Sequence, residues 1–246
     1  MASLAFALAF ALALALALAL SLLPVPAAAA GLTPLVHNQA VGAAWHVVGL
    51  PKQSVPLTRY AVDTVDGREA LRVQVAASYG NLVHDLAGVP APTTLRWSWR
   101  LAQANALTDL RNKAGDDAAV KVCLSFDLSL DRVPFVERQV LRMARTSTGQ
   151  ALPAATLCWV WGSAEAKGTL LPDPYSRRVR YIVLRQSQDK LSTWFDETRD
   201  VAADFRRAFG DESADLPPVT AVIVSGDGDN TGATSLAHVS DLRFEP

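Results

Sequence analysis

Hydrophobic and polar residues alternate most clearly in two segments near the middle of the chain. In residues 95–101, one face carries Leu95, Trp97, Trp99 and Leu101. In residues 119–127, the apolar face carries Val120, Val122, Leu124 and Phe126. Successive side chains of a strand point to opposite faces, so each segment is predicted to be a half-buried strand. The polar face of the second strand, which carries Lys121 and Ser125, is either solvated surface or the floor of a binding groove.

Similar short segments recur along the rest of the chain, separated by turn residues. They cover residues 45–48, 57–62, 70–76, 79–84, 157–161, 178–185, 219–224 and 237–244. Asp66-Gly67 predicts a tight hairpin turn, because both residues tolerate a positive φ. Apolar residues recur every three or four positions in residues 131–145 and 202–210, which predicts short helices there. The pattern indicates an all-β fold, a jelly roll or β-sandwich with one or two short helices.

The first thirty residues carry no charged side chain and are rich in Ala and Leu. Pro24 and Pro26 interrupt the apolar run, and small residues precede Gly31, as in a secretory signal peptide. The alternative is a retained membrane anchor, because the run is long enough to span a bilayer. We therefore expect residues 1–30 to be a signal peptide, residues 31–246 to form a single β-sandwich domain, and the protein to be periplasmic or secreted.

The net charge of the chain excludes some classes of partner. The 246 residues include 23 basic and 24 acidic side chains, giving a formal net charge of -1. Such a chain has no overall attraction for nucleic acid or for an anionic membrane. We expect no nucleic-acid partner, and membrane contact only through the N-terminal segment if that segment is not cleaved.

The two cysteines, Cys123 and Cys158, each lie in a predicted strand. In an oxidising compartment, cysteines on neighbouring strands can form a disulfide. The alternative is a pair of buried thiols that pack as small apolar side chains. The spacing of the two cysteines does not decide between a disulfide and two thiols.

An acidic, glycine-rich loop follows the predicted strand at residues 219–224. Asp227, Asp229 and Asn230 place oxygen atoms at closely spaced positions, a pattern that suits calcium. The alternative is an acidic turn whose side chains bond their own backbone. We expect a metal site at these three residues, with calcium as a candidate cofactor.

Candidate ligand-binding residues are Arg100, Asp117 and Arg199. They are predicted to converge at the strand ends, where the arginines meet a ligand or pair with Asp117. The tryptophans allow two interpretations. They form part of the core, which their alternation with smaller residues favours, or an exposed subset forms a platform for sugars.

A family resemblance rests on a series of short motifs in order along the chain. They are Trp97-Ser98-Trp99-Arg100, Gly115-Asp116-Asp117, Cys158-Trp159-Val160-Trp161, Asp173-Pro174-Tyr175, Glu197-Thr198-Arg199-Asp200-Val201, Asp204-Phe205-Arg206 with Phe209-Gly210, and Asp227-Gly228-Asp229-Asn230-Thr231. In combination, from about Trp45 to Phe244, the chain resembles an uncharacterised bacterial family of exported proteins, a domain of unknown function. A looser similarity is to galactose-binding-type jelly rolls, which implies a fold and no activity.

Three classes of function follow. We expect an exported domain that binds a glycan or another small ligand. The first alternative is a polysaccharide hydrolase or lyase, with Asp117 or Glu197 as acid or base and Arg199 at the transition-state charge. The second is a structural or partner-binding envelope protein, for which a large exposed apolar patch would be the sign.

Overall fold

The computed structural model describes residues 31–245, and the predicted signal peptide lies outside these residues. Its strands are β1 (Val36–His37), β2 (Ala40–Val41), β3 (Trp45–Val48), β4 (Arg59–Val65), β5 (Arg68–Ala76), β6 (Asn81–Val89), β7 (Thr94–Gln103), β8 (Lys121–Phe126), β9 (Ala155–Trp161), β10 (Leu170–Pro172), β11 (Val179–Arg185), β12 (Phe195–Asp200), β13 (Val219–Ser225) and β14 (Thr234–Glu245). Its helices are η2 (Leu130–Arg132), α2 (Phe135–Thr148) and α3 (Val201–Phe209). The predicted β-sandwich class is confirmed.

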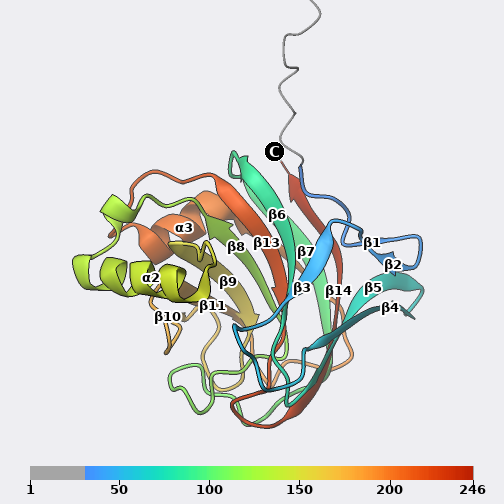
Figure 1. The fold of residues 1–246 in the computed structure, drawn as a ribbon. Coiled ribbons are helices and arrows are strands. Elements are labelled where there is room, and N and C mark those ends of the chain that lie inside the picture. The colour runs from blue at the N-terminus through green and yellow to red at the C-terminus, as the bar shows by residue number, and fades with distance from the viewer. Residues whose placement is uncertain (1–30, 246) are drawn as a thin grey trace, which may run out of the picture.

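Two large sheets face one another. The seven-stranded sheet has the order β10-β11-β9-β8-β13-β6-β3, and the five-stranded sheet has the order β12-β7-β14-β5-β4. Strands β9 and β11 pair in parallel, whereas the pairs around β8, β13 and β14 are antiparallel. Figure 1 shows the two sheets as layers, with α2 and α3 together at one side of the sandwich.

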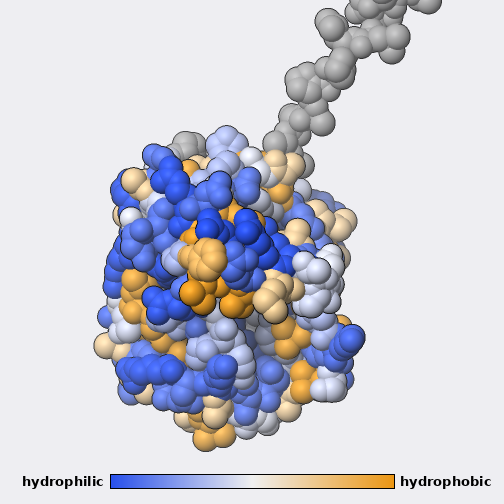
Figure 2. Space-filling view, turned by 60° about the vertical axis from the view of Figure 1, so that its left-hand side comes forward, coloured by the Kyte–Doolittle hydropathy of each residue, from blue (hydrophilic) through white to orange (hydrophobic). Residues whose placement is uncertain are grey.

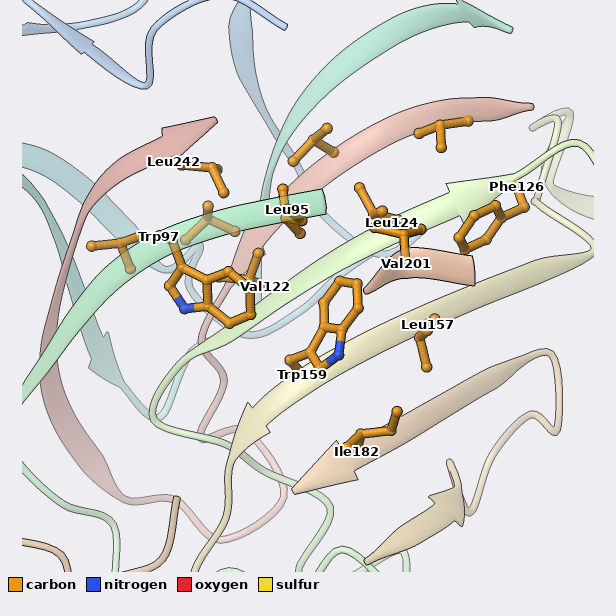
Figure 3. Packing of buried hydrophobic residues seen from close by; sticks show 14 of the residues in the cluster. Leu95, Trp97, Val122, Leu124, Phe126, Leu157, Trp159, Ile182, Val201 and Leu242 are labelled. Carbon is orange, nitrogen blue, oxygen red and sulfur yellow. The ribbon is translucent and has the colours of Figure 1, made fainter. Parts of the chain in front are cut away.

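The core lies between the sheets and is built from the alternating apolar positions. Figure 3 shows Leu95 and Trp97 of β7 pointing toward Val122 of β8 and Trp159 of β9. Trp97 packs on Trp159 and Trp99 packs on Trp161, each pair with ring centroids 5.6 Å apart. All four rings are at most 2 % exposed. The interpretation of these tryptophans as core residues is confirmed, and they are not available to a ligand.

Helix α3 closes one end of the core. Asp200 caps its first turn by accepting a hydrogen bond from the Ala203 backbone N–H, an arrangement that stabilises helix N-termini. Phe205 and Phe209 face inward, and Phe205 packs against Phe126 of β8. The helix predicted at residues 202–210 therefore forms and buries its apolar face.

Helix α2 forms as predicted, but its apolar residues face solvent. Phe135, Val136, Val140 and Met143 are between 62 and 72 % exposed, and Leu141 is the helix's buried residue. Figure 2 shows hydrophobic surface ringed by hydrophilic residues on the side of the molecule that carries α2. Within residues 31–245, no helix has the length and apolar character needed to cross a bilayer.

Candidate functional site

A groove runs along the outer face of the seven-stranded sheet. Because β8 alternates, the face opposite its core residues carries Lys121, Cys123 and Ser125, and all three line a cavity of about 500 Å³. A neighbouring hollow of about 740 Å³ shares Asn81 and Ser125 with this cavity. The sequence did not decide whether the polar face of β8 is solvated surface or the floor of a groove. In the structure it is the floor of a groove.

A disulfide forms part of this floor. Cys123 of β8 and Cys158 of β9 are directly opposite in the antiparallel ladder, with Cα atoms 4.0 Å apart, and they are bonded to each other. Both residues line the cavity. Of the two states that the sequence allowed for these cysteines, the structure has the disulfide, which joins two central strands beneath the groove.

Lys121 and Asp227 form a buried ion pair at one side of the groove. Lys121 Nζ lies 2.6 Å from Asp227 Oδ2, and the Ala118 backbone N–H donates to Asp227 Oδ1 at 2.6 Å. Burial alone would lower the pKa of Lys121, but the carboxylates of Asp227 and Asp116 outweigh it and raise that pKa. Lys121 is therefore a fixed positive charge whose main partner is Asp227.

Glycines allow the loop of Asp227 to approach the sandwich closely. A Cβ atom at Gly226 would lie 2.7 Å from the Ala119 carbonyl oxygen, and one at Gly228 would lie 2.7 Å from the Ala233 carbonyl oxygen. Any larger residue at either position would push the loop away. The two glycines therefore hold Asp227 within reach of Lys121.

Asp116 lines the same cavity but has no close partner. It is 6 % exposed, and within the described residues its one side-chain hydrogen bond is a long one, 3.4 Å from the Tyr181 hydroxyl to Oδ1. Burial raises the pKa of Asp116 to about 7, with Asp173 and Asp227 adding to the rise and Lys121 opposing it. The carboxyl group thus exchanges a proton near neutral pH.

Asp173 and two tyrosines form the opposite wall. Tyr181 donates a hydrogen bond of 2.6 Å to Asp173 Oδ2, while the backbone N–H groups of Tyr175 and Ser176 donate to Asp173 Oδ1. The Tyr175 hydroxyl donates to Asn230 Oδ1 at 2.8 Å, and the ring remains 58 % exposed. Tyr175 therefore presents an aromatic ring to the groove, and the hydrogen bond to Asn230 fixes its orientation.

Asp117 lies behind the groove rather than in it. It is fully buried and is not among the cavity-lining residues. Its oxygens accept hydrogen bonds from the backbone N–H and side-chain groups of both Asn230 and Thr231. Asp117 thus holds the 229–231 loop in place.

Arg100 and Arg199 do not converge with Asp117. Arg100 of β7 lies 3.5 Å from Asp66, and Arg199 of β12 donates two hydrogen bonds of 2.8 Å to Asp204. Both belong to the five-stranded sheet, whereas the groove belongs to the other sheet. The expected convergence of these arginines with Asp117 is therefore wrong, because the strand order separates them.

The predicted metal residues lie at the rim of the groove. Asp227, Asp229 and Asn230 line the cavity, but Asp227 already holds Lys121 and the Ala118 N–H. Among residues 31–245, no three His, Cys, Asp or Glu side chains are grouped as metal ligands. Asn230 contributes an amide, and calcium also accepts amide and backbone oxygens. Calcium at these residues stays a prediction.

Sequence reasoning missed several residues of the groove. Asp173, Tyr175 and Tyr181 all line it, together with Tyr79. Asp116, Asp173 and Tyr175 belong to motifs of the family resemblance, and Tyr181 lies in a predicted strand. The motifs were therefore a usable signal, but nothing in the sequence showed that they meet in space.

Comparison with known families identifies the group to which the chain is related. A family described as "Protein of unknown function (DUF3047)" matches residues 43–243. The chain belongs to this family. The predicted membership of a family of unknown function is confirmed, and no curated protein matches the chain.

Several solved structures resemble the DUF3047 chain at low identity. An exo-β-agarase is 10 % identical, with a TM-score of 0.35, and the match covers 88 % of this chain but only 25 % of the agarase. The K3 adhesin domain of Lys-gingipain from Porphyromonas gingivalis W83 is 11 % identical over 87 % of this chain and 98 % of that one, with a TM-score of 0.40. Endoglucanase 3 of family GH12 from Trichoderma harzianum is 9 % identical over 88 % and 97 %, with a TM-score of 0.43. None of these similarities transfers a residue or an activity to this chain.

Proposed function

We propose that the protein is exported and binds a neutral glycan in the groove of the seven-stranded sheet. The observation that carries the proposal is the lining of the cavity. It combines tyrosine rings with hydroxyl, amide and carboxylate groups, from Tyr79, Tyr175, Tyr181, Asn81, Asn230, Ser125, Thr156 and Ser225 together with four aspartates. Export rests on the uncharged, alanine-rich N-terminal segment.

The chemistry of sugars suits this lining. A sugar ring has an apolar face that packs on an aromatic ring, and hydroxyl groups that need both donors and acceptors. The exposed ring of Tyr175 offers an aromatic surface. The side chains of Asn81, Thr156 and Ser225 offer hydrogen-bond donors and acceptors. The hollow beside the cavity extends the groove, so several sugar units can bind in a row.

The charges of the cavity favour a neutral ligand. Asp116, Asp173, Asp227 and Asp229 line it against the single cationic group of Lys121. That cation is already paired with Asp227 at 2.6 Å. An anionic sugar would therefore meet uncompensated carboxylates in a partly desolvated site, which is unfavourable.

Thermal unfolding with a panel of polysaccharides tests the proposal. A ligand bound by the native state raises the melting temperature by mass action. We expect a rise with at least one neutral polysaccharide among β-glucan, xyloglucan, mannan, xylan, dextran and agarose, and none with alginate or polygalacturonate. A rise only with the acidic polymers would contradict the charge argument, and no rise at all would contradict glycan binding.

The variant Tyr175→Ala locates the binding site. Loss of the exposed ring removes its contact with the sugar face, so we expect an affinity about tenfold weaker, equal to about 1.4 kcal/mol. Affinity electrophoresis in gels containing the polysaccharide measures this change. The matched control is Phe135→Ala, because Phe135 is an aromatic residue of α2 that is 66 % exposed and outside the groove. Equal retardation of wild type and Tyr175→Ala would place the site elsewhere.

A further inference from the structure

The floor of the groove is a band of side chains that runs across the strands of the seven-stranded sheet. Residues directly opposite one another in neighbouring strands share one face of a sheet. In strand order from β11 to β3, the residues of the band are Tyr181, Cys158, Cys123, Ile223, Val83 and His46. Tyr181 and the disulfide line the first cavity, Val83 and His46 line the neighbouring hollow, and Ile223 lines both. The two hollows therefore share one continuous floor.

Polar side chains follow both edges of this band. On the edge nearer the loop after β13, Asn81 of β6 lies opposite Ser225 of β13. On the other edge, Ser125 of β8 lies opposite Thr156 of β9, and their hydroxyl groups are 3.0 Å apart. Asp85 of β6 continues this second edge into the neighbouring hollow. The groove is therefore largely apolar along its middle and offers hydrogen-bonding groups along both sides.

The shape of this floor selects among glycans. In a β-1,4-linked glucan, mannan or xylan, both bonds that continue the chain leave each ring equatorially, so the chain is extended. The faces of its rings carry C–H groups and its edges carry most of its hydroxyl groups. Such a chain places apolar faces on the middle of the floor and hydroxyl groups at both polar edges. An α-1,6-linked chain such as dextran turns at each flexible linkage and cannot match all three zones at once.

The length of the floor sets the number of sugar units. The band crosses six adjacent strands from β11 to β3, and neighbouring strands lie about 4.8 Å apart, so the band is roughly 24 Å long. One unit of an extended β-1,4-linked chain advances by about one strand spacing, about 5 Å. A chain of about five units therefore reaches from Tyr181 to His46.

We propose that the ligand is an extended β-1,4-linked glycan that lies across the strands, over the band from Tyr181 to His46. This proposal rests on the glycan binding proposed above and names the class of glycan. The disulfide and Ile223 form the middle of the floor, and the exposed ring of Tyr175 lies at the wall of the first cavity. Units over Val83 bind only when the chain is long enough to extend beyond the first cavity.

Isothermal titration calorimetry with two matched series of oligosaccharides tests the proposal. The first series contains β-1,4-linked gluco-, manno- and xylo-oligosaccharides of two to six units, and the second contains α-1,6-linked gluco-oligosaccharides of the same lengths. We expect the affinity for at least one β-1,4-linked series to rise by at least about tenfold from two to five units and then to level off. The α-1,6-linked series should bind at least about tenfold more weakly at five units.

The variant Val83→Lys tests whether the ligand reaches the second hollow. Val83 is a half-buried residue on the outer face of β6, and a lysine there places a charged side chain on the apolar floor. We expect the affinity for five units to fall by about tenfold, and the affinity for two units to stay at the wild-type value. The matched control is Val65→Lys, since Val65 is a half-buried valine of β4 in the other sheet and lines neither hollow. It should match wild type at every length.

The outcomes separate this proposal from glycan binding in general. Equal binding of the two series, or binding of the α-1,6-linked series alone, would overturn the extended β-1,4-linked chain and leave glycan binding intact. Full affinity already at two units would overturn the shared floor, as would wild-type affinity of Val83→Lys for five units. No binding of either series, together with no melting shift for any polysaccharide, would overturn both proposals. If Val83→Lys fails to fold, the length dependence of wild type decides.

Discussion

At the scale of single residues, Asp116 and Asp117 show how neighbouring carboxyl groups acquire different roles. Side chains alternate between the two faces of a strand, so a regular strand continued back from Lys121 would place Asp117 on the groove face. The strand begins only at Lys121, and the Asp117 N–H bonds to the Gly115 carbonyl oxygen at 2.7 Å in a tight turn. This turn changes the phase, so Asp116 faces the cavity and Asp117 faces the loop. The sequence shows two adjacent carboxyl groups, but it does not show which of them faces the cavity.

Burial of Asp116 makes stability depend on pH. A free aspartate titrates near pH 4, and the folded protein raises the pKa of Asp116 to about 7. Between these values the folded state binds more protons than the unfolded state, so this contribution to stability is present at low pH and is lost as the pH rises through 7. The stability of wild type relative to Asp116→Asn should fall by roughly 2 kcal/mol between pH 4.5 and 8, less than the full shift because the groove is open to solvent.

Urea unfolding of the two proteins across this pH range measures the difference. Asp215→Asn serves as the control, because Asp215 is exposed and outside the groove. It should follow wild type at every pH. A constant difference between wild type and Asp116→Asn would show that Asp116 titrates as an ordinary exposed carboxyl group.

At the scale of elements, alternation predicted most strands because each buries one face. The segments at residues 95–101 and 157–161 became β7 and β9, and residues 202–210 became α3 with its apolar face buried. Strand β10 was missed because three residues are too few to show a period. Helix α2 was predicted from its period, but the same period could not reveal that its apolar face is exposed. The period of the apolar residues predicts a helix, but it does not predict whether another element packs against the apolar face.

The cross-strand disulfide should stabilise the seven-stranded sheet. It closes a loop between positions 35 residues apart, and such a link lowers the entropy of the unfolded chain. Replacing Cys123 and Cys158 together by Ala should lower the free energy of unfolding by about 2–4 kcal/mol. Urea unfolding of the double variant and of reduced wild type measures the effect. Equal midpoints for the variant and the oxidised protein would contradict this role.

At the scale of the whole molecule, the order of strands decides which side chains meet. Arg100 and Arg199 lie on β7 and β12, while Asp227 lies on the loop after β13 of the other sheet. Nothing in the sequence states this order, so the predicted convergence of arginines and aspartates failed. The same order places β8, β9, β11 and β13 side by side. The outward residues of these strands, each unremarkable alone, thereby form one groove.

The two outer faces of the sandwich differ in kind. The five-stranded sheet presents charged side chains paired with one another, such as Arg68 with Asp241 at 3.4 Å and Arg96 with Glu245 at 2.8 Å. The seven-stranded sheet presents the groove, which is lined by tyrosines and by the weakly hydrogen-bonded carboxyl group of Asp116. We therefore propose ligand binding on one face only.

Amide hydrogen exchange in the presence and absence of a bound oligosaccharide tests this assignment most directly. The oligosaccharide is prepared from the polymer that gives the largest melting shift. We predict slower exchange in the groove segments that flank the cavity, above all at residues 173–176 and 226–231, and unchanged exchange in β4 and β5. Protection confined to the five-stranded sheet would contradict the account.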